Sequence, residues 1–126
     1  MDLNLQGNQL QSLPDGFLST MPRLESLTIT GNQVARLPKD LGRCEALQTL
    51  YAGANNLTDA SPAFEPPCII HAGLAHNAIS QLPSTKTLSR AEAMISLDLT
   101  HNNLSSLPDA LAKLAGANTR FLLSST

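Results

Sequence analysis

One pattern of apolar residues recurs along this chain of 126 residues and constrains its fold more than any other feature. In its most complete form, at 94–108, an apolar residue leads to Leu-x-Leu, then an asparagine, then a further leucine and a Leu-Pro pair. The pattern returns at 24–38, and incomplete versions run over 3–14, 47–57 and 69–83. One such unit cannot bury its own leucines, so units of this kind are stable only when they stack side by side.

The asparagine of each unit defines the period. The asparagines follow one another at intervals of 24, 23, 22 and 25 residues. They are Asn8, Asn32, Asn55, Asn77 and Asn102. This pattern, repeated at about 20–29 residues, resembles the leucine-rich-repeat family over residues 1–110. The resemblance implies an α/β solenoid in the shape of a curved horseshoe. Its concave face is a parallel β-sheet, and its convex face carries short helical or 3-10 segments and loops.

Each strand is expected where apolar residues alternate. In Leu97-Asp98-Leu99 the two leucines point to one side of a short strand and the aspartate to the other. By the same alternation we expect Leu27 and Ile29 in the core and Thr28 outside it. The strands would then lie side by side around one continuous strip of leucine.

The chain is expected to form a single repeat domain over 1–126. The predicted repeats are 1–23, 24–46, 47–68, 69–93 and 94–116, with a partial sixth strand at 117–126. Neither end carries a capping helix or a cysteine-rich cap in this sequence. We therefore expect a piece of a longer protein, or uncapped ends through which the chain could self-associate.

The asparagines are expected to form a structural ladder. An amide both donates and accepts hydrogen bonds, so it can satisfy the backbone of its own turn and of a neighbouring turn. The family resemblance implies that all five are buried.

The segments between strands contain prolines that favour different structures. Pro14, Pro38 and Pro108 are each followed three residues later by an apolar residue, which predicts a short helical segment. The proline-rich stretch 62–67 is expected to be extended. Ser89-Arg90-Ala91-Glu92 matches a capping box and would open a helix.

Composition excludes several classes of function. The net charge is −2 and no basic run marks a nucleic-acid surface. No apolar stretch is long enough to span a membrane. Residues 1–5 lack the charged start of a secretory signal, so a cytoplasmic protein is expected. Cys44 fills an apolar slot of the repeat and is expected to be a buried thiol, with a disulfide to Cys68 as the alternative. No cofactor and no zinc site are expected.

The outward side chains of the strands and turns are the candidate partner-binding site, because the resemblance implies that the concave face binds. The candidates are Asn4, Gln6, Thr28, Thr30, Thr49, Tyr51, His71, His76, Asp98, Thr100 and His101. Tyr51, the only tyrosine, is either an interface anchor or an ordinary surface residue.

The histidines permit a second interpretation of this face. His76 and His101 occupy equal positions in adjacent repeats, so they could form a metal site or a pH-sensitive site. A hydrated polar surface is the simpler interpretation and the one we favour. Asp98 near His101 could suggest acid–base chemistry, but no serine or cysteine is placed as a nucleophile. We therefore expect no catalysis.

Two functions of different class follow. The first is a non-catalytic scaffold that binds another protein in its concave face. The alternative is the recognition module of a larger signalling protein or enzyme, such as a kinase, ligase or receptor, whose effector domain is absent from this sequence.

Overall fold

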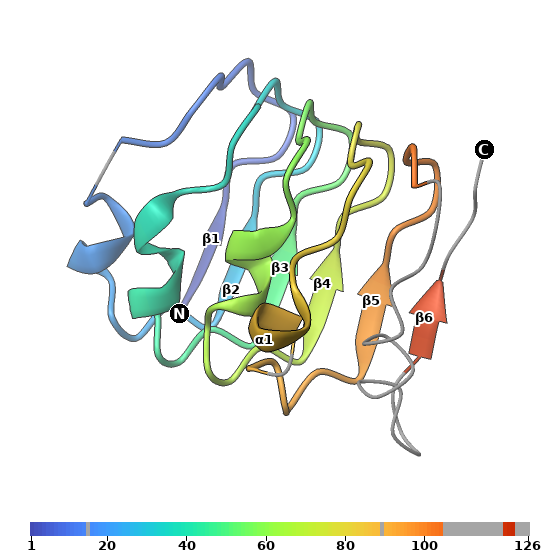
Figure 1. The fold of residues 1–126 in the computed structure, drawn as a ribbon. Coiled ribbons are helices and arrows are strands. Elements are labelled where there is room, and N and C mark those ends of the chain that lie inside the picture. The colour runs from blue at the N-terminus through green and yellow to red at the C-terminus, as the bar shows by residue number, and fades with distance from the viewer. Residues whose placement is uncertain (15, 89, 105–119, 123–126) are drawn as a thin grey trace.

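In the computed structural model, residues 1–14, 16–88, 90–104 and 120–122 are described. Their strands form one parallel sheet whose order follows the chain, as Figure 1 shows. The strands are β1 (Asp2–Asn4), β2 (Ser26–Thr28), β3 (Thr49–Tyr51), β4 (His71–Gly73), β5 (Ser96–Asp98) and β6 (Arg120–Leu122). This arrangement confirms the predicted leucine-rich-repeat solenoid with a parallel sheet. The limits assigned to the individual repeats remain a prediction.

The register of the sheet places equivalent residues of successive repeats side by side. Leu27 pairs with Leu3 on one side and with Leu50 on the other, and Leu97 pairs with Phe121. Each strand is only three residues long, because the turn after it must begin early enough to place the asparagine.

The core lies between the sheet and the segments that return behind it. Leu27, Ile29, Leu97 and Leu99 are all fully buried, as predicted, and Thr28 is only partly covered. The buried apolar residues of successive repeats belong to one cluster that runs along the stack, so the core is a strip rather than a sphere.

Short helices cover one side of the sheet, in front of the strands in Figure 1. They are η1 (Leu18–Thr20), η2 (Lys39–Arg43), η3 (Ser61–Phe64) and α1 (Thr85–Leu88). The helical segments predicted after Pro14 and Pro38 are confirmed as η1 and η2. The segment predicted after Pro108 lies outside the described residues.

The prediction of an extended stretch at 62–67 is wrong at its start. Pro62 lies in the first turn of η3. Backbone N–H groups at that position have no acceptor within the helix, so a proline, which lacks the N–H, costs nothing there. Asp59 Oδ1 accepts hydrogen bonds from the backbone N–H of Ser61 at 2.9 Å and from its hydroxyl at 2.7 Å. Phe64 at the other end is fully buried and anchors the turn.

The capping-box prediction is also wrong. Ser89 lies outside the described residues, and residues 90–93 form no helix. The helix of this repeat is α1, which ends before that motif, and Ser84 Oγ accepts a hydrogen bond from the N–H of Thr87 at 3.4 Å. Within the part of the chain that the structure describes, no helix is long and apolar enough to cross a membrane.

Candidate functional site

The face of the sheet turned away from the short helices is called the concave face here. Its side chains form two rows through the register of β1 to β5. One row is Asp2, Ser26, Thr49, His71 and Ser96, and the other is Asn4, Thr28, Tyr51, Gly73 and Asp98. All the predicted partner-binding residues are exposed or partly exposed, and the strands and turns bring them to one surface. Their role in binding remains a proposal.

Among the described side chains of this face, Tyr51 is the largest exposed one, with 47% of its surface accessible. Its ring leans across the neighbouring strand, because a Cβ atom on Gly73 would lie only 3.0 Å from Cδ1 of Tyr51. The glycine therefore leaves the space that the tyrosine ring occupies.

Asp98 stands on the far side of Gly73 from Tyr51, since Gly73 pairs with both residues. Its Oδ1 accepts hydrogen bonds from the backbone N–H of Thr100 at 3.0 Å and from the Thr100 hydroxyl at 2.8 Å. The bonds go to Thr100 rather than to His101, so the structure gives no support to an Asp98–His101 acid–base pair.

His76 and His101 stack on each other at the end of the sheet. Their ring centroids lie 4.2 Å apart and the ring planes differ by 11°. His71 lies elsewhere, in the first row between Thr49 and Ser96. Among the described residues, no group of three or more His, Cys, Asp or Glu side chains could hold a metal ion.

The stacked histidines occupy a turn position with a left-handed backbone. The φ angles are 57° at His76 and 56° at His101, and the equivalent Ala54 has 53°. Gly7 and Gly31 fill the same position in the first two repeats, at 73° and 74°. Glycine suits this position best, histidine tolerates it better than most residues, and alanine is strained there.

The asparagine after this position joins each turn to the preceding repeat. The Nδ2 of Asn32 donates to Leu5 O at 3.0 Å, and its Oδ1 accepts from the N–H of Leu10 at 3.1 Å. Asn55, Asn77 and Asn102 make the same two kinds of bond to the repeat before their own.

The expectation that all five asparagines are buried is wrong for Asn8 and only partly right for Asn77. Asn8 is exposed, and among the described residues it bonds only Leu5 O and Gln6 O, both of its own repeat. Asn77 is partly exposed, whereas Asn32, Asn55 and Asn102 are buried.

Both cysteines are free thiols, and they differ in their degree of burial. Cys44 is fully buried and Cys68 is exposed, so the alternative of a disulfide between them is not realised. Burial raises the pKa of the Cys44 thiol above its ordinary value of 9.0, and the negative charge of Asp40 raises it further.

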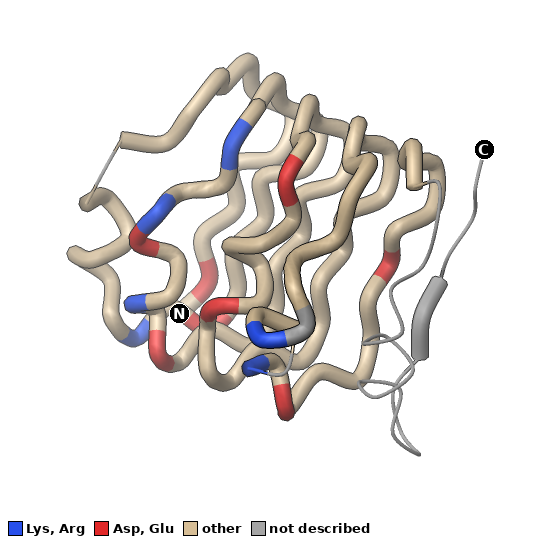
Figure 2. Tube along the Cα trace, in the orientation of Figure 1, with Lys and Arg blue, Asp and Glu red and all other residues tan. Residues whose placement is uncertain are grey.

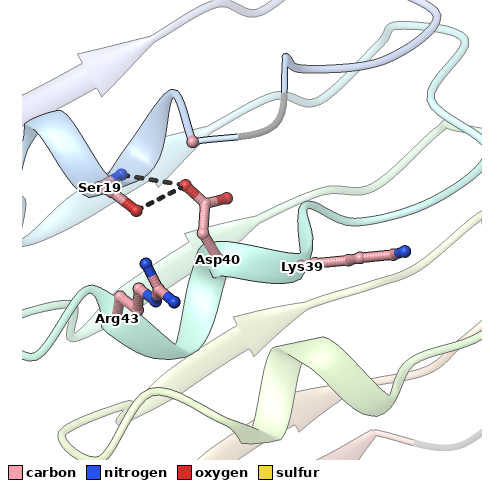
Figure 3. A pocket seen from close by; sticks show the side chains of 5 residues that line it. Ser19, Lys39, Asp40 and Arg43 are labelled. Carbon is pink, nitrogen blue, oxygen red and sulfur yellow. Dashed lines mark hydrogen bonds between the residues drawn. The ribbon is translucent and has the colours of Figure 1, made fainter.

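A hollow between η1 and η2, on the opposite side of the molecule, was not predicted. It is lined by Gly16, Ser19, Lys39, Asp40 and Arg43. Figure 3 shows Asp40 Oδ2 bonded to the backbone N–H of Ser19 at 3.0 Å and to its hydroxyl at 3.2 Å, while Lys39 points away. The Ser19–Asp40 contact joins the returning segments of two different repeats. Because these segments vary in length and sequence, the repeat pattern could not predict it.

Comparison with known proteins agrees with the geometry. Leucine-rich-repeat family models match residues 1–57 and residues 94–114. The fold is also similar to that of a leucine-rich-repeat protein of Leptospira interrogans, with a TM-score of 0.77 and 22% identity over 95% of this chain and 36% of that one. The stacked parallel strands and the asparagine turns define a solenoid repeat protein. The chain belongs to the leucine-rich-repeat family.

Curated relatives are much longer than this chain. It is 26% identical to an adenylate cyclase of Podospora anserina over 90% of its own length, which is 6% of the cyclase. It is 31% identical to PH domain leucine-rich repeat-containing protein phosphatase 1 of Mus musculus over 79% of its length, which is again 6% of that protein.

Proposed function

We propose that this chain is a non-catalytic protein–protein interaction module that binds a partner protein through its concave face. The observation that carries the proposal is the contiguous row of small and polar side chains across β1 to β5, with Tyr51 exposed near its centre. Large exposed aromatic residues are frequent anchors of protein interfaces. The cytoplasmic location expected from the sequence remains a prediction.

The rigidity of the face supports the same proposal. The strands and turns are joined by backbone bonds such as Ile29 N–H to Tyr51 O at 2.8 Å, and by the asparagine ladder. A face held in this way loses little conformational freedom on binding, which favours affinity.

Site-specific photo-crosslinking tests this proposal. A photoreactive amino acid is placed at Thr28 on the concave face and, in a matched variant, at Arg43 in η2 on the opposite side. Both variants are expressed in the source cells, and crosslinked proteins are identified by mass spectrometry. A partner captured from Thr28 and not from Arg43 is expected, and capture from Arg43 alone would contradict the proposal.

A second candidate is the recognition module of a larger signalling protein or enzyme, such as a kinase, ligase or receptor. This chain spans only 6% of the adenylate cyclase and 6% of the phosphatase that it resembles. That small share favours the second candidate. The full reading frame around the gene segment tests this candidate. An effector domain in the same frame would support it, and a frame that encodes repeats alone would contradict it.

A further inference from the structure

We propose that the surface over Gly73, between Tyr51 and Asp98, binds the guanidinium group of an arginine side chain on the partner protein. This inference rests on the proposed function, because it names the chemistry of the partner at the concave face. It combines three features of the described residues: an aromatic ring, a carboxylate with bonding capacity left, and a glycine between them that lets the ring lie over its strand toward the carboxylate.

The register brings the ring and the carboxylate to the same row. Tyr51 pairs with Gly73, and Gly73 pairs with Asp98, so the two side chains stand two strands apart. Neighbouring strands are about 4.8 Å apart, which places the two Cα atoms roughly 10 Å from each other. The tyrosine ring already leans toward β4, with Cδ1 at 3.0 Å from the point where a Gly73 Cβ would stand. A planar cation can therefore contact the ring and the carboxylate together.

The charge of Asp98 is not needed for the turn that Asp98 stabilises. Asn4 is the equivalent residue of the first repeat, and its neutral Oδ1 accepts the same bond, from the N–H of Gln6 at 2.9 Å. The corresponding Asp98 bond to Thr100 measures 3.0 Å. An uncharged side chain thus serves the local structure equally well, so the negative charge is available for another role.

The surroundings of Asp98 favour a cation from another molecule. Its only hydrogen bonds within the described residues go from Thr100 to Oδ1, and they leave Oδ2 open. Strands β1 to β5 carry no lysine or arginine, and Figure 2 shows the basic positions on the connections and returning segments. The backbone of Arg120 in β6 pairs in register with Ser96, and Asp98 pairs with Leu122.

Arginine matches this surface better than lysine. The planar guanidinium stacks on aromatic rings and also offers paired N–H donors to a carboxylate. Cation–π contacts and exposed ion pairs are individually weak. We therefore expect each of the two groups to contribute a roughly three- to tenfold change in affinity rather than an absolute requirement.

An NMR titration of the full chain, labelled with ¹⁵N, tests the inference. The probe is N-acetyl-arginine methylamide, and the matched probe is the citrulline analogue, which has nearly the same shape and no charge. Saturable shifts at the amides of Gly73 and Asp98 are expected with arginine and not with citrulline. Equal responses to both probes would overturn the inference.

Single substitutions separate the contributions of Tyr51 and Asp98 to arginine binding. Asp98→Asn keeps the acceptor for Thr100, and Tyr51→Leu keeps apolar bulk without the ring. Each should weaken arginine binding roughly three- to tenfold, whereas Asp2→Asn, which removes the other acidic side chain of the described strands, should not. Arg120→Gln should bind arginine at least as tightly as the parent chain. Unchanged binding in Asp98→Asn, or weaker binding in Arg120→Gln, would contradict the inference.

The captured partner distinguishes this inference from the proposed function. If a partner crosslinks from Thr28 and its affinity is the same for the parent chain and Asp98→Asn, the arginine site is wrong and the concave-face proposal stands. If the partner crosslinks only from Arg43, the concave-face proposal itself fails.

Discussion

Asn55 accepts a hydrogen bond at its Oδ1 from the backbone N–H of Val34, at 3.0 Å, so a side chain of one repeat completes the turn of the repeat before it. The same amide donates through Nδ2 to Ile29 O at 3.0 Å. Both contacts are buried. Stacking therefore depends on buried polar bonds as well as on leucine packing, and losing the amide would leave backbone groups unpaired.

The first prediction concerns this ladder. Asn55→Ala should lower the free energy of unfolding by about 1–3 kcal/mol, because it leaves buried backbone groups without partners. Asn8→Ala is the matched control and should cost less, since Asn8 is exposed and, within the described part of the chain, bonds only its own repeat. Urea denaturation followed by circular dichroism measures both. Equal losses of unfolding free energy in the two variants would contradict the prediction, because the bonds between repeats would then contribute nothing to stability.

The second prediction concerns the two faces of a strand. Leu27→Ala should destabilise the chain by roughly 2–5 kcal/mol, because it opens a cavity in the core strip. Thr28→Ala, one residue further along β2, should stay within about 0.5 kcal/mol. Thermal unfolding of both variants is the measurement. A loss at Thr28 as large as that at Leu27 would mean that the faces are assigned wrongly.

The third prediction concerns the left-handed turn position. Ala54 has a φ angle of 53°, where an L side chain costs about 1–2 kcal/mol. Glycine removes that cost but loses about 0.5–1 kcal/mol of chain entropy, so Ala54→Gly should stabilise the chain by roughly 0.5–1 kcal/mol. Gly31→Ala makes the reverse change at the equivalent position and should destabilise it. The midpoints of urea denaturation measure the stability of both variants. If Ala54→Gly is less stable than the parent chain, Ala54 is not strained.

The fourth prediction concerns the buried thiol. Burial first, and then the charge of Asp40, raise the pKa of Cys44 in the folded state, so the fold favours the protonated thiol. The resulting stability is fully present below pH 9.0, the ordinary value, and is lost as the pH rises through the higher folded-state pKa. Between pH 8 and pH 10 the parent chain should lose more stability than Cys44→Ala.

Thiol labelling checks the same prediction independently. With a disulfide reagent at pH 8, Cys68→Ser should react slowly through Cys44, and Cys44→Ser should react fast through the exposed Cys68. Comparable rates in the two variants would contradict the burial of Cys44.

The repeat pattern predicted the sheet well because each asparagine fixes the strand before it. Counting back from Asn32 places Leu27 and Thr28 on their observed faces. The pattern failed where local chemistry outside the repeat decides the structure. At Pro62, the side chain of Asp59 and the burial of Phe64 turned a stretch expected to be extended into η3.

The candidate site was predicted as a surface but not in its internal contacts. The alternation of side chains placed Tyr51 and Asp98 on the concave face. That the ring leans over Gly73 depends on a side-chain torsion, and the Asp98 bond to Thr100 depends on the local turn. Neither contact is encoded in residue spacing, so the repeat pattern could predict neither.

The affinity of a captured partner for two tryptophan variants tests the concave-face proposal most directly. Thr49→Trp places a bulky side chain in the centre of the sheet, between Ser26 and His71 in register. Lys39→Trp places the same group in η2, at an exposed position whose side chain points away from Ser19 and Asp40 in Figure 3. By isothermal titration calorimetry, Thr49→Trp should weaken binding at least tenfold and Lys39→Trp should leave it unchanged. Unchanged binding for Thr49→Trp together with a loss for Lys39→Trp would contradict the proposal.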